Sequence, residues 1–506
     1  MIQFENQLKK LKHEVLTEVA KLAKEDKLTP WEIERIPYEI IEGNKAQYRC
    51  CVYKERAIVL ERAKLAAGYL ANGDNINDEF IDISPDEQII YVIEAACDRC
   101  PINRYSVTDS CRNCLAHRCR EACNFGAISY INGKAYINQE MCKECGMCKK
   151  ACPYDAISDV MRPCKGSCPT GALEINKEDR IAMIKEEICV NCGSCMSSCP
   201  FGAISDRSLI VPVAKGLSKG VEMYAVVAPA ITGQFGMKTT YGQIKNAIKK
   251  LGFKDMIEVA CGADAVTVHE SNEFIERMEA GDKYMTSSCC PGFLNYVEKM
   301  FPGELDKVSG TVSPMVATGR YIKAKEPEAK VVFIGPCTAK KSEAVRESIK
   351  DAVDYVLTFE ELLGLFSAFE VNPSDCEDEI VEDASIFGRG FGINGGLTVA
   401  IQNYVKSENL EVDFKPVKVS GGAEIKKTMT MGKIGKLQGN FIEGMMCEGG
   451  CINGAGTLAT AMKAKAPFIK VNAGSSIKHV IDNKNLEEYK NINLERIKIT
   501  NIVKNI

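Results

Sequence analysis

The chain has 506 residues, of which 45% are hydrophobic and 26% charged, and its formal net charge is −4. This composition is typical of a globular protein of about three or four domains, and the small net charge disfavours a nucleic-acid binder, which usually has a strongly basic face. No stretch reaches the roughly 18 apolar residues of a membrane-spanning helix, and the N-terminus lacks the apolar core of a signal peptide. We therefore expect a cytoplasmic protein with neither a membrane nor a nucleic acid as its partner.

Residues 1–90 are predicted to form a helical N-terminal segment. Apolar residues recur at helical spacing in FENQLKKLKHEVLTEVAKLAKED, which ends before Pro30, and again in YRCCVYKERAIVLERAKLAAG, which ends at Gly68. Cys50 and Cys51 stand at the start of the second helix. We interpret them as packing or incidental thiols rather than metal ligands.

Cysteine is the unusual feature of the composition, with 25 cysteines against four histidines. In a long cytoplasmic chain so many thiols favour metal binding over disulfides. Because histidines are few, the ligands must be nearly all thiolates, which favour zinc or iron–sulfur clusters. Sixteen of the cysteines fall within residues 97–206, so we treat residues 91–206 as one metal-binding region.

Two runs in this region have the spacing C-x2-C-x2-C-x3-C followed by proline: CKECGMCKKACPYDAIS and CVNCGSCMSSCPFGAIS. This is the spacing of bacterial ferredoxins, in which three thiolates of a run bind one 4Fe–4S cluster and the fourth binds the other. Zinc usually takes paired C-x2-C units instead. By the crossed rule we predict one cluster on Cys142, Cys145, Cys148 and Cys199, and another on Cys189, Cys192, Cys195 and Cys152.

The C-x3-C ending occurs four times, as CREACNFGAI, CKKACPYDAI, CKGSCPTGAL and CMSSCPFGAI. Sixteen thiolates are the number that four clusters need, so we predict a second, divergent pair and a ferredoxin-like α+β fold for the whole region. His117, in CLAHRC, is an alternative ligand that we interpret as structural. The expected sets are Cys111, Cys114, Cys119 and Cys168 for one cluster, and Cys97, Cys100, Cys164 and Cys123 for the other.

Residues 207–506 have the pattern of an α/β domain. MYAVVAPAI, KVVFIGPC and DYVLTF are typical of buried strands, and helical segments such as TYGQIKNAIKKLGF lie between them. Five of the seven cysteines beyond residue 206 fall in TSSCCPGF, GPCTAKKSEA and EGMMCEGGCINGAG; Cys261 and Cys376 are expected to be packing residues. Cysteines of these segments can supply one more cubane cluster and leave Cys289 as a surplus thiol; the four candidate ligands are Cys290, Cys337, Cys447 and Cys451.

These three segments resemble the signature segments of the iron–iron (FeFe) hydrogenases, TSCCPxW, PCxxKxxE and ExMxCxxGCxxGxG, and the resemblance spans about residues 221–456. Because the front end is rich in clusters and has no PAS-type sensor, the resemblance is to the monomeric group B branch of clostridial type. It implies an H-cluster, a 4Fe–4S cubane joined through one cysteine to a two-iron unit that carries carbon monoxide, cyanide and a dithiolate bridge. The resemblance implies that Cys290, Cys337, Cys447 and Cys451 hold the cubane, with Cys451 as the shared ligand.

The same resemblance assigns roles to residues around the cofactor. Lys340 matches the lysine that meets a cyanide, Met445 matches a methionine near the diiron unit, and Pro229 matches a pocket wall. Cys289 matches the proton carrier, since a thiol with an ordinary pKa near 8.5 exchanges protons near neutral pH. The remaining members of the implied relay are Glu270, Ser309 and Glu273.

The sequence departs from the family pattern at Gly335, Met315, Ala230 and Phe293, where a methionine, a glutamine, a serine and a tryptophan are usual. These departures remove polar or bulky contacts to the diiron ligands but leave the metal ligands in place. GFGING at residues 390–395 fits a dinucleotide motif literally. We do not expect nucleotide binding there, because such a motif must open a βαβ unit.

The implied reaction is H2 ⇌ 2 H+ + 2 e−, with electrons leaving through the clusters to an external carrier such as ferredoxin. Assembly of the diiron unit implies dedicated maturation proteins. Two alternatives stay open: a non-catalytic iron–sulfur protein like the Narf-like relatives of eukaryotes, and a hydrogen sensor.

Overall fold

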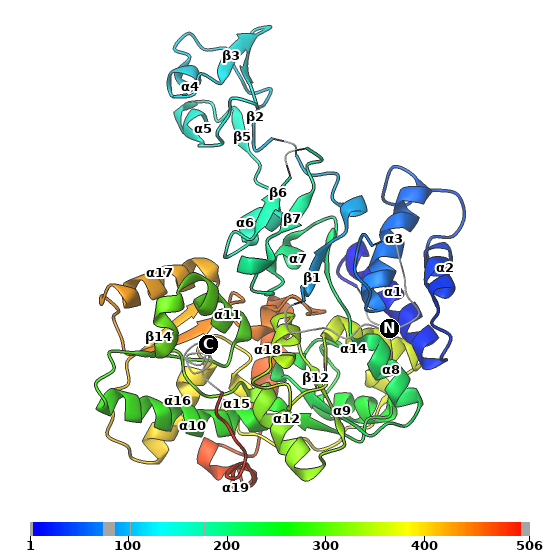
Figure 1. The fold of residues 1–506 in the computed structure, drawn as a ribbon, viewed down its shortest axis with the longest axis vertical. Coiled ribbons are helices and arrows are strands. Elements are labelled where there is room, and N and C mark those ends of the chain that lie inside the picture. The colour runs from blue at the N-terminus through cyan, green and yellow to red at the C-terminus, as the bar shows by residue number, and fades with distance from the viewer. Residues whose placement is uncertain (1–3, 74–86, 102, 177, 497–506) are drawn as a thin grey trace, which may run out of the picture.

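The computed structural model describes residues 4–73, 87–101, 103–176 and 178–496. One small lobe and a helical segment adjoin a large α/β domain, and a second small lobe lies beyond the first (Figure 1). We call residues 103–160 the outer lobe, and residues 87–101 together with 161–206 the inner lobe. Among the described residues, no helix has the length and apolar content needed to cross a membrane.

The N-terminal segment contains α1 (Gln7–Lys24), α2 (Pro30–Ile40) and α3 (Val52–Ala66). Side-chain caps start the first two: Asn6 accepts the Lys9 N–H at 2.9 Å, and Thr29 caps α2 ahead of Pro30. The apolar face of α1 packs on α14 and α8 of the large domain, and its Val15 is fully buried. Cys50 and Cys51 precede α3 and are exposed, so they are not packing residues.

The two lobes have ferredoxin-like α+β folds, and one is inserted into the other (Figure 1). In the outer lobe β2 pairs with β5 and β3 with β4, all antiparallel. In the inner lobe β1 pairs with β8 and β6 with β7. The outer lobe comprises β2 (Tyr105–Val107), α4 (Arg118–Glu121), β3 (Ile128–Ile131), β4 (Lys134–Ile137), α5 (Met147–Ala151) and β5 (Ile157–Asp159). The inner lobe comprises β1 (Ile90–Val92), α6 (Pro163–Ser167), β6 (Leu173–Ile175), β7 (Ala182–Ile184), α7 (Ser194–Ser198) and β8 (Ile204–Asp206).

The large domain has two parallel sheets, in the strand orders β10-β9-β12-β13 and β11-β15-β14. The first consists of β9 (Met223–Val227), β10 (Asp255–Glu258), β12 (Lys330–Ile334) and β13 (Tyr355–Leu357), which include all three strands predicted from the sequence. The second consists of β11 (Met285–Thr286), β14 (Pro416–Ser420) and β15 (Phe441–Met445). The cysteines of the three predicted cubane segments lie past the carboxyl ends of β11, β12 and β15, where α/β folds commonly bind ligands.

Helices surround these sheets, and the core between them is apolar. The helices are α8 (Ile210–Ser218), α9 (Tyr241–Lys250), α10 (Val259–Glu279), α11 (Pro291–Met300), α12 (Pro314–Lys325), α13 (Ala339–Ala344), α14 (Phe359–Ala368), α15 (Ile386–Gly390), α16 (Gly396–Ser407), α17 (Gly422–Lys433), α18 (Ala461–Ala473) and α19 (Leu486–Tyr489). The GFGING segment joins α15 to α16 rather than following a strand, so it does not open a βαβ unit. Cys261 and Cys376 are buried, as expected of packing residues.

A buried lysine joins the inner lobe to the large domain. The Lys341 side chain is 0% exposed, and its Nζ lies 2.7 Å from Asp206 Oδ2 and 3.0 Å from Glu361 Oε1. It also donates to the Arg207 carbonyl at 2.8 Å. All three ammonium protons are thus satisfied, and the end of β8 is fixed to α13 and α14.

Lys341→Met is expected to destabilise this junction by about 3–5 kcal/mol, because it leaves two buried carboxylates without their cation. Chemical denaturation of the cluster-loaded protein, followed by far-UV circular dichroism, measures the change. Lys350→Met is the matched control: its ion pair with Glu347 is exposed on both sides, so its midpoint should not move. Equal midpoints for both variants would show that the junction does not depend on Lys341.

Candidate metal centre

Four cysteines from three loops line one buried cavity of about 90 Å³. Cys290 follows β11, Cys337 follows β12, and Cys447 and Cys451 follow β15. Burial raises the pKa values of the Cys337, Cys447 and Cys451 thiols, and neighbouring thiolates raise them further. The pKa of Cys451 rises to about 12. Thiols held together in this way ionise readily only when a soft cation binds them. The donor set therefore fits a thiolate-bound metal cluster.

The other residues expected around this cofactor line the same cavity. Cys289, Lys340, Met445 and Pro229 are all among the lining side chains. The cavity wall is otherwise mainly apolar, with Met315 and Ala230 at two of the positions where the family pattern has polar residues.

The other two departures have a packing explanation. A Cβ at Gly335 would lie 2.5 Å from Cζ of Phe333, so the Phe333 ring takes the space of the usual methionine. Phe333 itself lines the cavity. Phe293 instead packs over Gly444, where an added Cβ would lie 2.4 Å from its ring.

Behind Cys289, two glutamates of α10 lie in different environments. Glu270 is fully buried; its Oε1 accepts the Ser288 N–H at 3.2 Å, and its Oε2 has no hydrogen-bond partner among the described residues. Burial, reinforced by the charge of Glu273, raises the pKa of Glu270 to about 8, and the hydrogen bond from the Ser288 N–H offsets this only in part. Glu270 is therefore a neutral acid at neutral pH.

Glu273 lies one helical turn further on and has the opposite pKa shift. Burial alone would raise its pKa, but hydrogen bonds from Gly310, Ser309 and Thr311 and the Arg277 charge lower it. Ser309 Oγ donates to Glu273 at 2.6 Å, and the Arg277 guanidinium lies 2.7 Å away. The structure thus brings together the expected residues and adds Arg277. The i, i+4 spacing of Glu273 and Arg277 on a helix is the sequence signal that could have found it.

The structure corrects the grouping of the sixteen cysteines of the two lobes. The thiol of Cys148 is surrounded by those of Cys142, Cys145 and Cys123. Cys168 lies beside Cys189, Cys192 and Cys195, whose pKa values burial and then the neighbouring thiolates raise. Cys199 lies beside Cys97, Cys100 and Cys164. The outer lobe also contains Cys111, Cys114, Cys119 and Cys152, which form the remaining set.

Each of the four predicted cluster sets is therefore wrong in one cysteine. The misplaced cysteines are Cys199, Cys152, Cys168 and Cys123. The crossed rule itself holds, but each complete run pairs with the divergent run of its own lobe, because the β2–β5 and β1–β8 pairings enclose them separately. No three cysteine, histidine or acidic side chains of the described residues converge on a single metal ion. A cubane does not need such convergence, since each thiolate binds its own iron. His117 stacks on Tyr130, with 3.8 Å between ring centroids.

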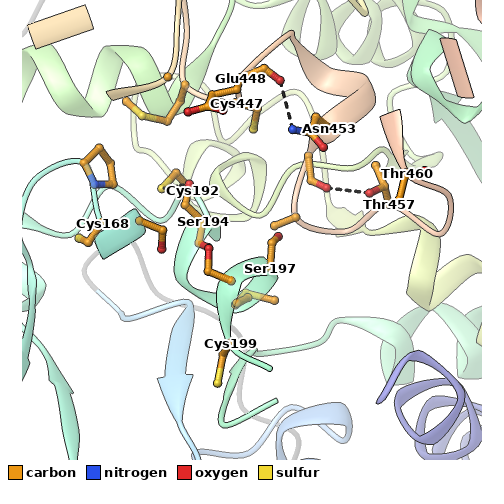
Figure 2. Close-up of a pocket in the computed structure, with 18 of the residues that line it drawn as sticks. Cys168, Cys192, Ser194, Ser197, Cys199, Cys447, Glu448, Asn453, Thr457 and Thr460 are labelled. Carbon is orange, nitrogen blue, oxygen red and sulfur yellow. Dashed lines mark hydrogen bonds between the residues drawn. The ribbon is translucent and has the colours of Figure 1, made fainter. Parts of the chain in front are cut away.

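The inner lobe brings one cluster site next to the cavity. Cys168, Cys192 and Cys447 line a pocket of about 1000 Å³ between the lobe and the large domain (Figure 2). The loop before α7 is held by the large domain: Thr338 Oγ1 donates to the Asn191 carbonyl at 2.7 Å, and Lys299 Nζ to the Cys189 carbonyl at 2.7 Å. The Cys189–Cys195 set is thus the one nearest the cavity.

Comparison with known proteins agrees with this geometry. The family described as "Iron only hydrogenase large subunit, C-terminal domain" matches residues 221–455, and 4Fe–4S binding and LdpA Fe–S cluster-binding domains match residues 135–158 and 157–210. The periplasmic Fe hydrogenase large subunit of Nitratidesulfovibrio vulgaris is 30% identical over 303 residues, which are 49% of this chain and 72% of that protein. The chain belongs to the iron-only hydrogenase family.

Members of this family differ in what they do. Iron hydrogenase 1 of Clostridium pasteurianum is 31% identical over 44% of this chain, and Protein NAR1 of Arabidopsis thaliana is 24% identical over 48%. The matched region spans 46% of the length of the clostridial protein and 66% of the length of the plant protein. A solved FeFe hydrogenase from Chlamydomonas reinhardtii aligns over 53% of this chain and 88% of its own, at 21% identity and a TM-score of 0.45.

Double substitutions test the corrected cysteine sets through iron content. Protein that carries only cubanes should hold about twenty irons, four for each of five clusters. Cys168→Ala and Cys192→Ala should each remove about four, and the double variant no more than either, because both act on one cluster. Cys152→Ala combined with Cys192→Ala should remove about eight. A loss of about eight irons in the Cys168/Cys192 double variant and of about four in the Cys152/Cys192 double variant would instead support the grouping predicted from the sequence.

The raised pKa of Glu270 predicts a pH-dependent stability. The folded protein holds a proton that the unfolded chain releases above pH 4.5, so this contribution is fully present below pH 4.5 and is lost as the pH rises to about 8. Glu270→Gln should therefore lose less stability than the unmodified protein across this range, as measured by melting temperature. Glu276→Gln, at an exposed position of the same helix, is the control. Parallel pH profiles for Glu270→Gln and the unmodified protein would contradict a buried neutral acid.

Proposed function

We propose that this chain catalyses the reversible oxidation of H2 to protons and electrons. The observation that carries the proposal is the surplus thiol: Cys289 lines the same cavity as four cluster-binding cysteines and has a line of acids behind it. A structural cluster needs four thiolates and no relay. A thiol beside a buried acid is what proton transfer to and from a buried site requires.

The residues present fit the H-cluster of the family. Cys290, Cys337, Cys447 and Cys451 would hold its cubane, Cys451 being shared with the diiron unit, and Met445 and Pro229 would pack against that unit. Lys340 would donate to an anionic cyanide ligand. When bound, the group would supply the two-iron site at which H2 is split and formed.

The protein's own part is to move protons and electrons through a cavity wall that excludes water. Cys289 would exchange a proton with the site and with Glu270, and Ser309 would pass it on to Glu273, where Arg277 holds the outer end in place. Electrons would leave through the inner-lobe clusters and then the outer lobe to a carrier such as ferredoxin. Dedicated maturation proteins would deliver the diiron unit in the cytoplasm.

We assign residues 1–90 to a supporting helical segment, 91–206 to the electron-transfer region and 207–506 to the catalytic domain. Within the family we place the chain in the monomeric group B branch, on its cluster-rich front end. A second candidate function comes from the relatives named cytosolic Fe–S cluster assembly factor NAR1. In that case the cavity would hold a cubane only, and the relay would have no use.

Cys289→Ala and Cys289→Ser test the proposed function together with infrared spectroscopy of the matured protein. CO and CN stretching bands are expected in the unmodified protein and in both variants. Turnover of H2 should fall about a hundredfold or more in the variants, the loss typical of a missing proton-transfer group. Matured protein without CO and CN bands would favour the NAR1-like function. A fully loaded Cys289→Ala variant with normal turnover would show that protons take another route.

A further inference from the structure

The C-terminal segment of the described chain brings an arginine into the interior beside the cavity. Residues 494–496 pair with residues 310–312: the Val312 N–H donates to the Leu494 carbonyl at 2.9 Å, and the Arg496 N–H to the Gly310 carbonyl at 2.7 Å. Arg320 holds the same segment from outside, with bonds to the carbonyls of Asn493 and Glu495 at 2.7 and 3.1 Å. The segment therefore fixes the position of the Arg496 side chain.

The Arg496 guanidinium is buried and only partly paired. Its side chain is 8% exposed, and Nη2 lies 3.6 Å from Glu343 Oε1 and 3.5 Å from the Ser288 carbonyl. Within the described residues, its Nε and Nη1 have no hydrogen-bond partner, and neither does Glu343 Oε1. Burying a cation costs free energy unless a nearby anion offsets its charge. The incomplete pairing of Arg496 therefore points to a role for its charge beyond packing.

Glu343 connects Arg496 to the cavity. Its side chain is 1% exposed, and its Oε2 accepts a hydrogen bond from Lys340 Nζ at 2.6 Å. Lys340 lines the cavity. Two cations thus share a single buried carboxylate, and the group Arg496–Glu343–Lys340 carries one net positive charge. Without Arg496 the pair of Glu343 and Lys340 would be neutral.

We propose that Arg496 is a positioning residue that gives the Arg496–Glu343–Lys340 group its net positive charge and so favours binding of an anionic, cyanide-bearing diiron unit beside Lys340. The inference rests on the proposed function. By pairing with the outer oxygen of Glu343, Arg496 offsets the carboxylate that would otherwise neutralise the Lys340 ammonium. Because all three charged side chains are buried, one uncompensated charge changes the binding of an anion far more than it would at the surface.

Loading experiments on cubane-containing protein test this role. The probe is a synthetic diiron dithiolate complex with carbon monoxide and cyanide ligands, and the readouts are CO and CN band intensity per cubane and the CN frequencies. Arg496→Met should lower loading about tenfold or more, the cost typical of removing one partner of a buried charge pair, and should shift the CN bands. Arg496→Lys, which keeps the charge, should restore both.

A charge-compensating variant separates this role from packing. Arg496→Met combined with Glu343→Gln removes one charge of each sign and leaves Lys340 alone, so loading should recover. If Arg496→Met does not fold, Glu343→Gln alone should raise loading and shift the CN bands, because it adds one net positive charge.

Unchanged loading and CN bands in Arg496→Met would overturn the inference, and so would a double variant that loads no better than Arg496→Met. In the substitute test, unchanged loading in Glu343→Gln would overturn it as well. The absence of CO and CN bands from the unmodified protein is a different outcome: it contradicts the proposed function and, with it, the basis for this role.

Discussion

Four thiols line one apolar cavity where loops from two parallel sheets meet, and the rest of the architecture depends on that constraint. Burial and mutual repulsion raise the pKa values of Cys337, Cys447 and Cys451, so the loops are compatible with thiolates only when a metal cluster neutralises them. In the proposed function, protons and electrons would reach the site through groups that the protein itself provides, which are the acid relay on one side and the cysteine-rich lobe on the other.

The two glutamates of the proposed relay lie in different environments. Glu270, Glu273 and Arg277 lie three and four residues apart on α10 and so share one face of the helix. Among the described residues no cation forms an ion pair with Glu270, and the free energy of burying a charge keeps it protonated. Glu273 is stabilised as an anion by four donors. A neutral inner acid next to an ionised outer base can pass a proton in either direction without burying a full charge near the metal.

Much of the site could be predicted from the sequence because its chemistry is concentrated in short segments. The cavity cysteines, Lys340 and Met445 lie in three runs whose spacing reflects loops after strands, and the structure brings these runs together. The cysteine sets could not be predicted correctly, because Cys168 and Cys152 have equivalent local spacing and only strand pairing distinguishes their partners. Arg496 gave no local signal at all. It reaches the site through pairing with Gly310, which is far away in the sequence.

The insertion of one lobe into the other separates the order of clusters along the chain from their order in space. Cys97 and Cys100 come first in the sequence, yet their set is completed by Cys164 and Cys199. The inner lobe therefore closes only when β8 reaches β1, across the whole outer lobe, and such long-range closure is entropically costly. The outer lobe needs only contacts between neighbouring runs and can form its clusters locally. Lys341 then fixes the end of β8 to α13 and α14, so the closure that completes the inner lobe also fixes the Cys189–Cys195 cluster site beside Cys447. In the proposed function, this arrangement makes the electron-transfer step between the cavity and the Cys189–Cys195 cluster a consequence of folding rather than of a flexible encounter.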